Sequence, residues 1–236
     1  MLRVLKLIPL VVVAMFHIGC NKDSSKAAPI VAAPLNAAGL NIKNECPSIR
    51  QNLETNHYSV TPGVYLTPLM KAAFAGNVSK VRSLLMHDKN IDMKDRYGRT
   101  ALQYAILGGN NDTFQILLRA GANINLQNTF KASSAHLAAV WNRTEMVKQM
   151  VNSGRLDVNT TSKFHGLTML HSAAANCNLD LIQFLIQHGA DVNKKSSDVK
   201  KNELLVTGRT PLKEAMAVSA GESIDLLLQL GADPSL

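Results

Sequence analysis

An internal repeat is the feature that most constrains how this chain can fold. One motif recurs five times, and the copy at 166–177 reads GLTMLHSAAANC. Every copy contains a Thr or Ser that precedes apolar and small residues. These hydroxyl residues are Thr67, Thr100, Ser133, Thr168 and Thr210, at steps of 33, 33, 35 and 42 residues. A near-constant period of this length predicts stacked units that each contact only their neighbours.

A second motif begins 21 residues after each hydroxyl residue, and an apolar pair such as Leu117 and Leu118 lies between the two. The five second motifs read DKNID, GANIN, GRLDVN, GADVN and GADPS. A hydroxyl before an apolar run is typical of a helix N-cap, and Pro68 and Pro211 fit the first helical position. The pattern therefore predicts two helices per repeat. A single pair cannot bury its apolar side alone, so the stacked copies must share one core.

This two-part pattern resembles the ankyrin repeat, over residues 64–236. The copies depart from it locally, for example with Tyr65 and Lys131 in place of glycine. The resemblance implies an all-α solenoid of about five helix-turn-helix repeats with β-hairpin loops, occupying residues 67–236. It also implies a concave surface of hairpin tips and inner helices that binds a protein partner.

Carried over by position, several tip and inner-helix residues are expected to contact that partner. They are Tyr97, Tyr104, Phe130, Leu137, Trp141, Phe164 and His165. An exposed row of aromatic side chains is typical of a protein-binding hot spot. The alternative, that some of these rings pack against neighbouring hairpins, stays open.

The spacing between the fourth and fifth copies is nine residues longer than the 33-residue period. The inserted stretch 194–207 reads KKSSDVKKNELLVT and carries Lys194, Lys195, Lys200 and Lys201. We expect these lysines to contact the partner as part of a long finger, because insertions in repeat proteins fall on the loops of one face. A passive, solvated insertion is the alternative.

Two histidines and a cysteine within residues 165–177 raise the question of a metal site or a Cys/His catalyst. His171 and His136 occupy equivalent repeat positions, where the resemblance implies a structural histidine that braces neighbouring loops by hydrogen bonds. His165 and His171 do not have the spacing of zinc ligands with any second pair of Cys or His residues. The sequence also contains no phosphate-binding loop and no nucleophile elbow. We therefore expect no enzyme activity, no metal and no cofactor. The alternative is an enzyme or metal protein built on His165, His171 and Cys177.

The first nineteen residues have a basic start and a ten-residue apolar run, Leu7 to Phe16, which is too short to cross a bilayer as a helix. The stretch ends in HIGC, which resembles a bacterial lipoprotein signal, although His17 stands where that family usually has Leu. The resemblance implies a signal peptide at 1–19 and lipidation of Cys20. Ordinary secretion is the alternative.

The residues after the signal are rich in Ala, Pro, Ser and Asn. We expect a lipid-anchored flexible tether at 20–45 and an N-terminal cap at 46–66. The expected location is the periplasmic side of the outer membrane, since Asn21 rather than Asp follows the cysteine.

The chain has a net charge of +8, and without Arg3 and Lys6 about +6 remains. On an exported chain this charge favours anionic lipid surfaces or an acidic protein partner over nucleic acid. The chain has three cysteines. If Cys20 is lipidated, Cys46 and Cys177 remain, about 30 Å apart along the stack by repeat spacing. That distance predicts no intramolecular disulfide, unless the N-terminal segment folds back along the stack.

Small ankyrin lipoproteins of the bacterial envelope resemble immunity proteins that neutralise type VI secretion effectors, especially phospholipases. This resemblance implies a lipase toxin as the partner and a chain that is monomeric when free. The alternative is an envelope scaffold that holds an endogenous periplasmic protein, for example in oxidative-stress protection.

Overall fold

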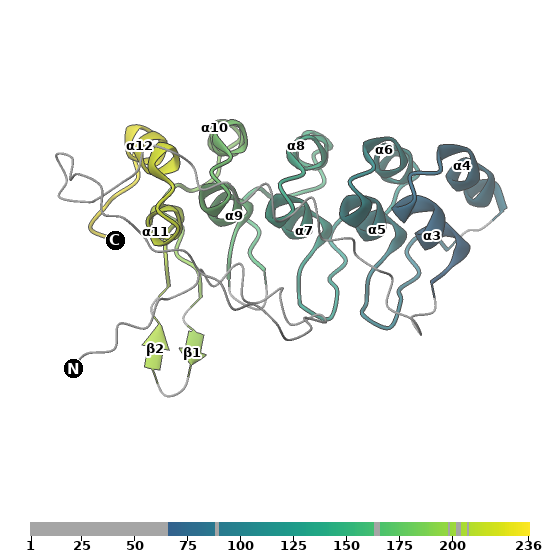
Figure 1. Ribbon diagram of the computed structural model, residues 1–236, viewed down its shortest axis with the longest axis horizontal. Coiled ribbons are helices and arrows are strands. Elements are labelled where there is room, and N and C mark those ends of the chain that lie inside the picture. Colours follow the sequence, from purple (N-terminus) through teal and green to yellow (C-terminus); the bar gives the residue numbers. More distant parts are fainter. Residues whose placement is uncertain (1–65, 88–89, 163–165, 198, 202–203, 207) are drawn as a thin grey trace, which may run out of the picture.

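The described helices form five pairs that stand side by side in two rows (Figure 1). The computed structural model describes residues 66–87, 90–162, 166–197, 199–201, 204–206 and 208–236. The inner row holds α3 (Pro68–Phe74), α5 (Ala101–Gly108), α7 (Ser134–Val140), α9 (Met169–Ala175) and α11 (Pro211–Ala217). The outer row holds α4 (Val78–His87), α6 (Asn111–Arg119), α8 (Thr144–Asn152), α10 (Leu179–Gln187) and α12 (Gly221–Gln229). The predicted all-α solenoid of five helix-turn-helix repeats is confirmed.

Each inner helix begins at the repeated hydroxyl residue. The Oγ1 atoms of Thr67, Thr100 and Thr210 accept hydrogen bonds from the backbone N–H three residues on, at 3.2, 3.4 and 3.3 Å. These bonds satisfy donors that the first turn of a helix cannot pair internally. Pro68 and Pro211 lie at the start of their helices, where no backbone N–H is required.

The turn between the two helices of a repeat is the same in all five copies. Its central residue has a left-handed backbone, and its N–H donates to the carbonyl three residues earlier. These left-handed turn residues are Gly76, Gly109, Asn142, Cys177 and Ser219, with φ of 69, 68, 55, 52 and 57°. A left-handed residue reverses the chain within one turn, so the outer helix can pack antiparallel on the inner helix.

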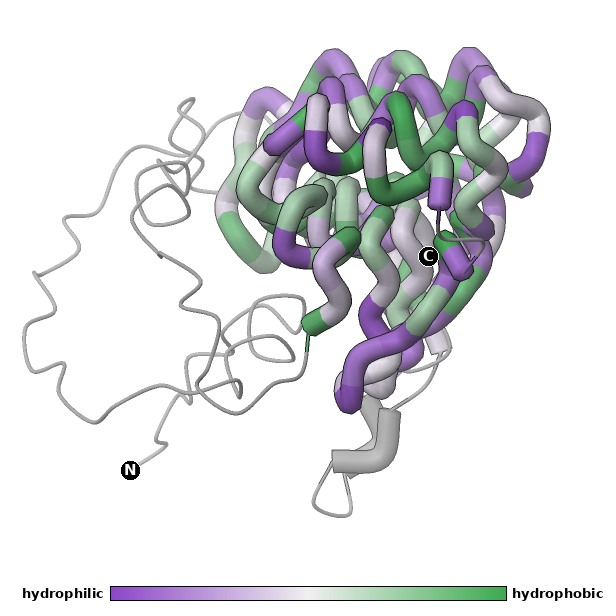
Figure 2. Tube along the Cα trace, turned by 90° about the vertical axis from the view of Figure 1, so that its right-hand side faces the viewer, coloured by the Kyte–Doolittle hydropathy of each residue, from purple (hydrophilic) through white to green (hydrophobic). Residues whose placement is uncertain are grey.

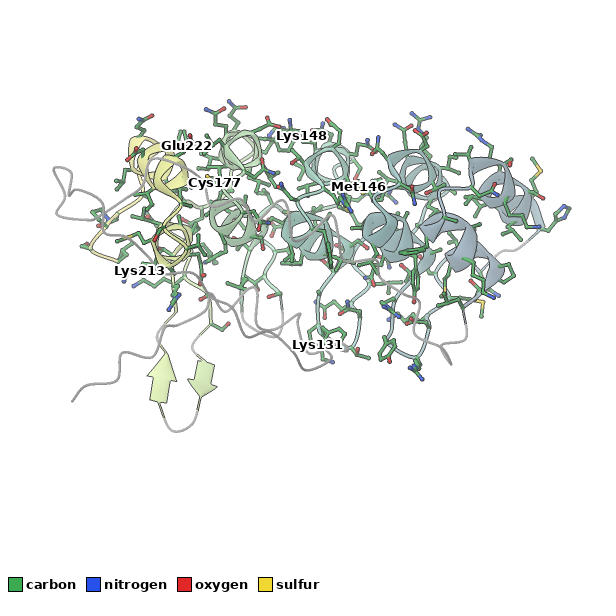
Figure 3. The ribbon with its side chains drawn as sticks, in the orientation of Figure 1. Lys131, Met146, Lys148, Cys177, Lys213 and Glu222 are labelled. Carbon is green, nitrogen blue, oxygen red and sulfur yellow. The ribbon has the colours of Figure 1, made fainter. Side chains whose placement is uncertain are left out.

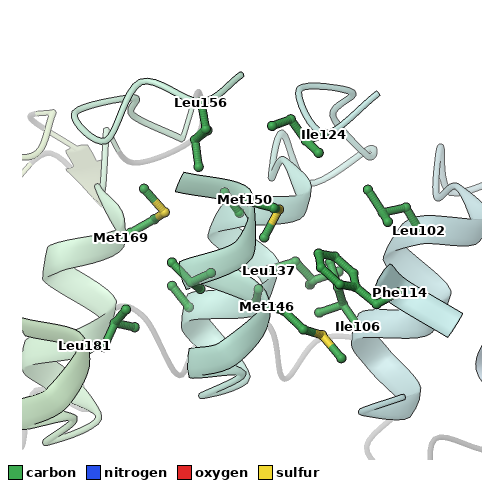
Figure 4. Packing of buried hydrophobic residues seen from close by; sticks show 14 of the residues in the cluster. Leu102, Ile106, Phe114, Ile124, Leu137, Met146, Met150, Leu156, Met169 and Leu181 are labelled. Atoms are coloured by element: carbon green, nitrogen blue, oxygen red, sulfur yellow. The ribbon is translucent and has the colours of Figure 1, made fainter. Parts of the chain in front are cut away.

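The apolar core runs through the whole stack instead of closing within any one repeat. Buried alanines such as Ala105, Ala139 and Ala174 let neighbouring inner helices approach closely. Larger side chains from the outer helices, including Phe114 and Met150, fill the space behind them (Figure 4). The buried residues therefore form one continuous cluster from α3 to α12.

The hairpin loops project from the inner row, and most of their residues are hydrophilic (Figure 2). Among the described residues, strands occur only in the insertion, where β1 (Val199–Lys201) pairs antiparallel with β2 (Leu204–Val206). The other hairpins are turns joined by backbone bonds, such as the 2.8 Å bond from the Thr129 N–H to the Tyr97 carbonyl. The predicted β-hairpin loops therefore have regular strand pairing only in the inserted finger.

The predicted signal peptide at 1–19, the tether at 20–45 and all of the 46–66 cap except Leu66 lie outside the described residues. These three assignments stay predictions. Within the part of the chain that the structure describes, every helix is too short or too polar to span a membrane.

Candidate protein-binding surface

The described parts of the hairpin loops together form a surface with a net positive charge, which we call the hairpin edge. It comprises the described residues of 93–99, 126–132, 160–166 and 194–209. Its described charged side chains are Lys94, Arg96, Arg99, Lys131, Lys194, Lys195, Arg209 and the single acid Asp95. Lys131 lies at the tip of a hairpin, well away from the helices (Figure 3). The other described acids, apart from Glu214, lie on the outer helices or in the loops that follow them.

Asp95 offsets the charge of Arg99 and not that of the exposed cations, because its side chain is fully buried against the Arg99 guanidinium. The carboxylate accepts hydrogen bonds from the backbone N–H groups of Tyr97 and Arg99 at 2.9 and 2.8 Å. The Arg99 guanidinium and the Tyr104 hydroxyl also donate to it, at 2.8 and 2.7 Å. Burial raises the pKa of Asp95, but these hydrogen bonds together hold it below its usual value. Burial and the bond to Asp95 raise the pKa of Tyr104.

The tip of this second-repeat hairpin presents an aromatic ring held between two cations. The guanidinium groups of Arg96 and Arg99 lie 4.7 and 4.8 Å from the centre of the Tyr97 ring. Arg96 also donates a 2.7 Å hydrogen bond to the Tyr97 hydroxyl. Arg96 is exposed and Tyr97 is half-buried. A ring and a guanidinium ordered before binding lose little conformational freedom on docking, which favours their use as an interface anchor.

The third and fourth repeats hold the next hairpins through buried histidines. On one side of its ring, His136 bonds the Ser133 hydroxyl at 2.7 Å, and on the other its Nε2 bonds the Thr160 carbonyl at 3.0 Å. His171 Nδ1 accepts from the Thr168 N–H at 3.1 Å, so Nε2 carries the proton and donates to the Arg209 carbonyl at 2.8 Å. The expectation that these histidines brace neighbouring loops is confirmed. Burial lowers the pKa of His136, and it lowers that of His171 to about 4.

Comparison with known proteins identifies the architecture. A family model described as ankyrin repeats matches residues 35–128, 108–196 and 135–236 in three overlapping copies. The chain belongs to the ankyrin-repeat family. This family is typically a protein-interaction module without catalytic activity, so binding of a protein partner is the general function that follows.

Curated relatives of this ankyrin-repeat chain come from diverse organisms. It is 28% identical to the nuclear factor NF-kappa-B p105 subunit of Gallus gallus, over 82% of this chain and 19% of the relative. It is 32% identical to a mitochondrial disaggregase of Bos taurus, over 72% of this chain and 24% of the relative. It is 28% identical to the putative ankyrin repeat protein YahD of Escherichia coli strain K12, over 70% of this chain and 80% of the relative. The chain thus spans less than a quarter of the length of the first two relatives.

The structure separates the expected partner-binding residues into groups. Tyr97, Phe130, Trp141 and Lys194 are half-buried and Lys195 is exposed, so all five retain accessible surface. Phe164 and His165 lie outside the described residues, as do the side chains of Lys200 and Lys201, whose backbone belongs to β1. A partner-binding role for all of these residues stays a prediction.

Tyr104 and Leu137 are buried, with only 3% and 4% of their surfaces exposed, so the expectation that they stand in an exposed row is wrong. The Tyr104 hydroxyl turns towards Asp95, and its ring meets Phe74 edge-on at 6.3 Å. Leu137 belongs to the continuous apolar core. Position on the inner helix did not predict the exposure of these side chains, because it does not determine whether a side chain packs against a neighbouring residue.

Sequence reasoning also missed several of the charged residues of the hairpin edge. Lys94, Arg99 and Lys131 carry most of its charge in the second and third hairpins, and Asp95 fixes its most ordered tip. The usable signal was the excess of Lys and Arg over Asp and Glu in the hairpin segments, read across repeats rather than within one. The pairing of Asp95 with Arg99 four residues later left no signal that distinguishes it from two solvated charges.

Two of the three residues of the alternative metal or catalytic site, His171 and Cys177, lie among the described residues. His171 is fully buried and uses both ring nitrogens in structural bonds. His165 lies outside the described residues, and the described residues contain no group of three or more potential metal ligands. Nothing in the described geometry joins His171 to Cys177 in a common site.

Cys177 is disulfide-bonded, so the expectation of no intramolecular disulfide does not hold, and only its stated exception, a partner in the N-terminal segment, remains. The chain has two other cysteines, Cys20 and Cys46, and both lie outside the described residues. The expectation measured separation along the repeat stack, and a partner from outside the stack was its one exception. A covalent partner can reach the fourth repeat from a segment that is not itself part of the stack.

Proposed function

We propose that this ankyrin-repeat chain is a lipid-anchored immunity protein of the bacterial envelope that binds a type VI secretion phospholipase and blocks it. The observation that carries the proposal is the hairpin edge, where Lys94, Arg96, Lys131 and Lys195 are exposed and the one described acid, Asp95, is buried against Arg99. Such a surface favours an acidic protein partner, because complementary charge speeds encounter and rejects basic surfaces.

The proposed location follows from the first twenty residues. Their resemblance to a lipoprotein signal supports attachment through Cys20 to the periplasmic side of the outer membrane. An anchored inhibitor at that surface would meet a membrane-attacking lipase where the lipase works. Metabolic labelling with a radioactive fatty acid tests this part separately: label on the chain that disappears in Cys20→Ser supports the anchor, and an unlabelled chain contradicts it.

The proposed mechanism is occlusion of the lipase entrance by the hairpin edge. The ordered tip of Arg96 and Tyr97 provides an anchor, and the inserted finger that carries β1 and β2 extends the same edge. An immunity protein must bind its toxin tightly, with a Kd of about 1 nM or below, which corresponds to roughly −12 kcal/mol. Anchoring by aromatic and guanidinium groups is the usual source of such affinity.

The test uses the chain without its signal, residues 21–236, as bait for envelope extract and for the products of neighbouring genes. The proposal requires capture of a lipase whose activity falls to near zero at one-to-one stoichiometry. Arg96→Glu is expected to weaken binding about tenfold or more, because it reverses charge at the ordered tip. Lys80→Glu is the matched control, since Lys80 is an exposed cation on the outer helix α4.

Capture of a resident envelope protein without a toxin would contradict the immunity role and support the scaffold alternative. Equal losses of lipase binding in Arg96→Glu and Lys80→Glu would contradict the hairpin edge as the binding surface.

A further inference from the structure

Cys177 occupies a position whose backbone conformation does not favour a cysteine. It is the left-handed turn residue of the fourth repeat, with φ of 52°, whereas the first two repeats have glycine there. Any residue with a β-carbon is disfavoured in this conformation, and only Asn and Asp tolerate it comparatively well. The role of this cysteine is therefore not conformational, because its sulfur is bonded in a disulfide.

The sulfur of Cys177 has two possible partners in the chain, Cys20 and Cys46. Cys20 ends the leader-like stretch, so in an exported chain its sulfur carries the lipid if the signal is of the lipoprotein type. A chain that stayed in a reducing cytoplasm would not keep a structural disulfide at all. We infer that Cys46 is the disulfide partner of Cys177, and that this bond fixes the segment before the first repeat to the turn of the fourth repeat.

Chain length permits this connection. Leu66 is the first described residue, and it belongs to the apolar core beside α3. The twenty residues from Cys46 to Leu66 can extend to about 66 Å, at about 3.3 Å per residue. The first and fourth repeats are three helix-pair spacings apart, or about 30 Å at about 10 Å each. The segment therefore reaches Cys177 with slack for a non-extended path.

The bond changes where the membrane tether leaves the domain. Without it, a tether would leave from the first repeat, at one end of the stack. With it, the tether leaves from the turn between α9 and α10. In Figure 3, Cys177 lies at the level of these helices, while Lys131 marks a hairpin tip. The attachment point thus lies apart from the hairpin edge. This inference depends on the export part of the proposed function and not on the identity of the partner.

The first experiment identifies the bond by peptide mapping. The full chain is expressed with its own leader, extracted with a thiol-alkylating reagent and no reductant, and digested with trypsin. Cleavage after Lys and Arg places Cys46 in the peptide 44–50 and Cys177 in the peptide 164–194. We expect these two peptides joined in a disulfide, in a chain that runs as a monomer without reductant. Alkylated Cys46 and Cys177, or Cys177 joined to a peptide that contains Cys20, would overturn the inference.

The second experiment separates the bond from the backbone conformation. Cys177→Gly suits the positive φ better than cysteine does, so it should raise the melting temperature if the bond contributes nothing. Closing a chain segment from residue 46 to residue 177 restricts the unfolded state strongly. We therefore expect Cys177→Gly and Cys46→Ser each to lower Tm by roughly 10 °C, with no further loss in the double variant.

The matched control for the turn is Asn142→Gly, at the equivalent position of the third repeat. It changes the same backbone site without removing a thiol, so we expect its Tm to stay within a few degrees of the parent or to rise. Additive losses for Cys46→Ser and Cys177→Gly, or an unchanged Tm in either variant, would overturn the proposed pairing.

Discussion

The hairpin of the second repeat and the hairpins entering the fourth and fifth repeats are held by different chemistry. In the second repeat, a buried carboxylate of the hairpin itself collects donors from Tyr97, Arg99 and Tyr104. In the later hairpins, a neutral histidine on the preceding inner helix forms a hydrogen bond with a backbone carbonyl. His136 bonds the carbonyl of Thr160, and His171 bonds that of Arg209. The first arrangement is ionic and lies within one repeat, whereas the second is neutral and links two repeats.

This difference predicts that the two regions fail in different ways. Loss of the Asp95 network should loosen one hairpin tip and leave the stack intact. Loss of a histidine link should uncouple neighbouring repeats, on whose contacts a solenoid depends for its stability. The following predictions test this contrast, from the largest expected effect to the smallest.

The largest effect is expected for His171→Ala. The substitution leaves a cavity and removes the partners of the buried Thr168 N–H and Arg209 carbonyl, which should cost about 3 kcal/mol of unfolding free energy. Urea denaturation followed by circular dichroism measures this loss. His188→Ala is the control, because His188 is an exposed residue at the end of α10 and should lose less than about 1 kcal/mol. Similar losses of unfolding free energy in both variants would contradict the prediction that the His171 link stabilises the stack.

The histidine links should also make the stack acid-sensitive. The unfolded chain binds a proton at His171 near pH 6.5, whereas burial lowers the folded pKa to about 4. Below pH 6.5 the unfolded state therefore binds more protons, and stability falls as the pH drops towards 4. The loss attributable to His171 reaches about 3 kcal/mol at most. The pKa of Asp95 is lowered, so its contribution to stability should be lost only at pH values below its ordinary 3.8.

Denaturant midpoints measured between pH 7 and pH 4 test this order of events. The same series on His171→Gln provides the comparison, since glutamine can keep a donor but does not titrate. We expect a shallower dependence on pH in that variant. An equally steep fall would assign the acid sensitivity to other groups.

A smaller effect is expected for Asp95→Asn. Removal of the charge leaves the Arg99 guanidinium, which has 12% of its side chain exposed, without its ionic partner. The expected loss is about 2 kcal/mol, below the usual range for a fully buried pair because Arg99 retains contact with water. Hydrogen exchange of the Tyr97 and Arg99 amides should accelerate, because both bond the carboxylate. Faster exchange spread over α9 and α11 as well would contradict a network confined to one repeat.

The smallest effect is expected for Tyr104→Phe. The ring and its packing against Phe74 remain, and Asp95 keeps its bonds from Arg99 and Tyr97. Loss of one hydrogen bond to a charged acceptor should therefore cost about 1 to 2 kcal/mol. Thermal denaturation of Tyr104→Phe, Asp95→Asn and the double variant measures the coupling. Strictly additive losses would show that the hydroxyl and the carboxylate do not act together.

Local and periodic features of the chain were predictable. The hydroxyl residues such as Thr100 cap helices, and Pro211 starts one, because these roles depend only on the adjacent turn of backbone. The bracing roles of His136 and His171 followed from the family resemblance at equivalent positions. Repetition helped, since five copies of one pattern average out the noise of any single segment.

Contacts between segments were not predictable in the same way. Tyr104 was expected on the surface and is buried, because a carboxylate nine residues earlier lies where its hydroxyl can reach. Cys177 was expected to be free of an intramolecular bond unless the N-terminal segment folds back along the stack, and it is disulfide-bonded. Both expectations came from treating each position by its place in the repeat.

The sequence by itself determined the repeat unit, the helix pairs and their order, because hydrogen bonding in caps and turns and the burial of an apolar face act over a few residues. Only the tertiary structure decided which polar groups neutralise one another, and hence that the exposed charges of the described hairpin edge are positive. Charge at a surface depends on whether an acid such as Asp95 is buried beside its partner or exposed to water. That distinction arises only when the folded chain brings those groups together and excludes solvent from them.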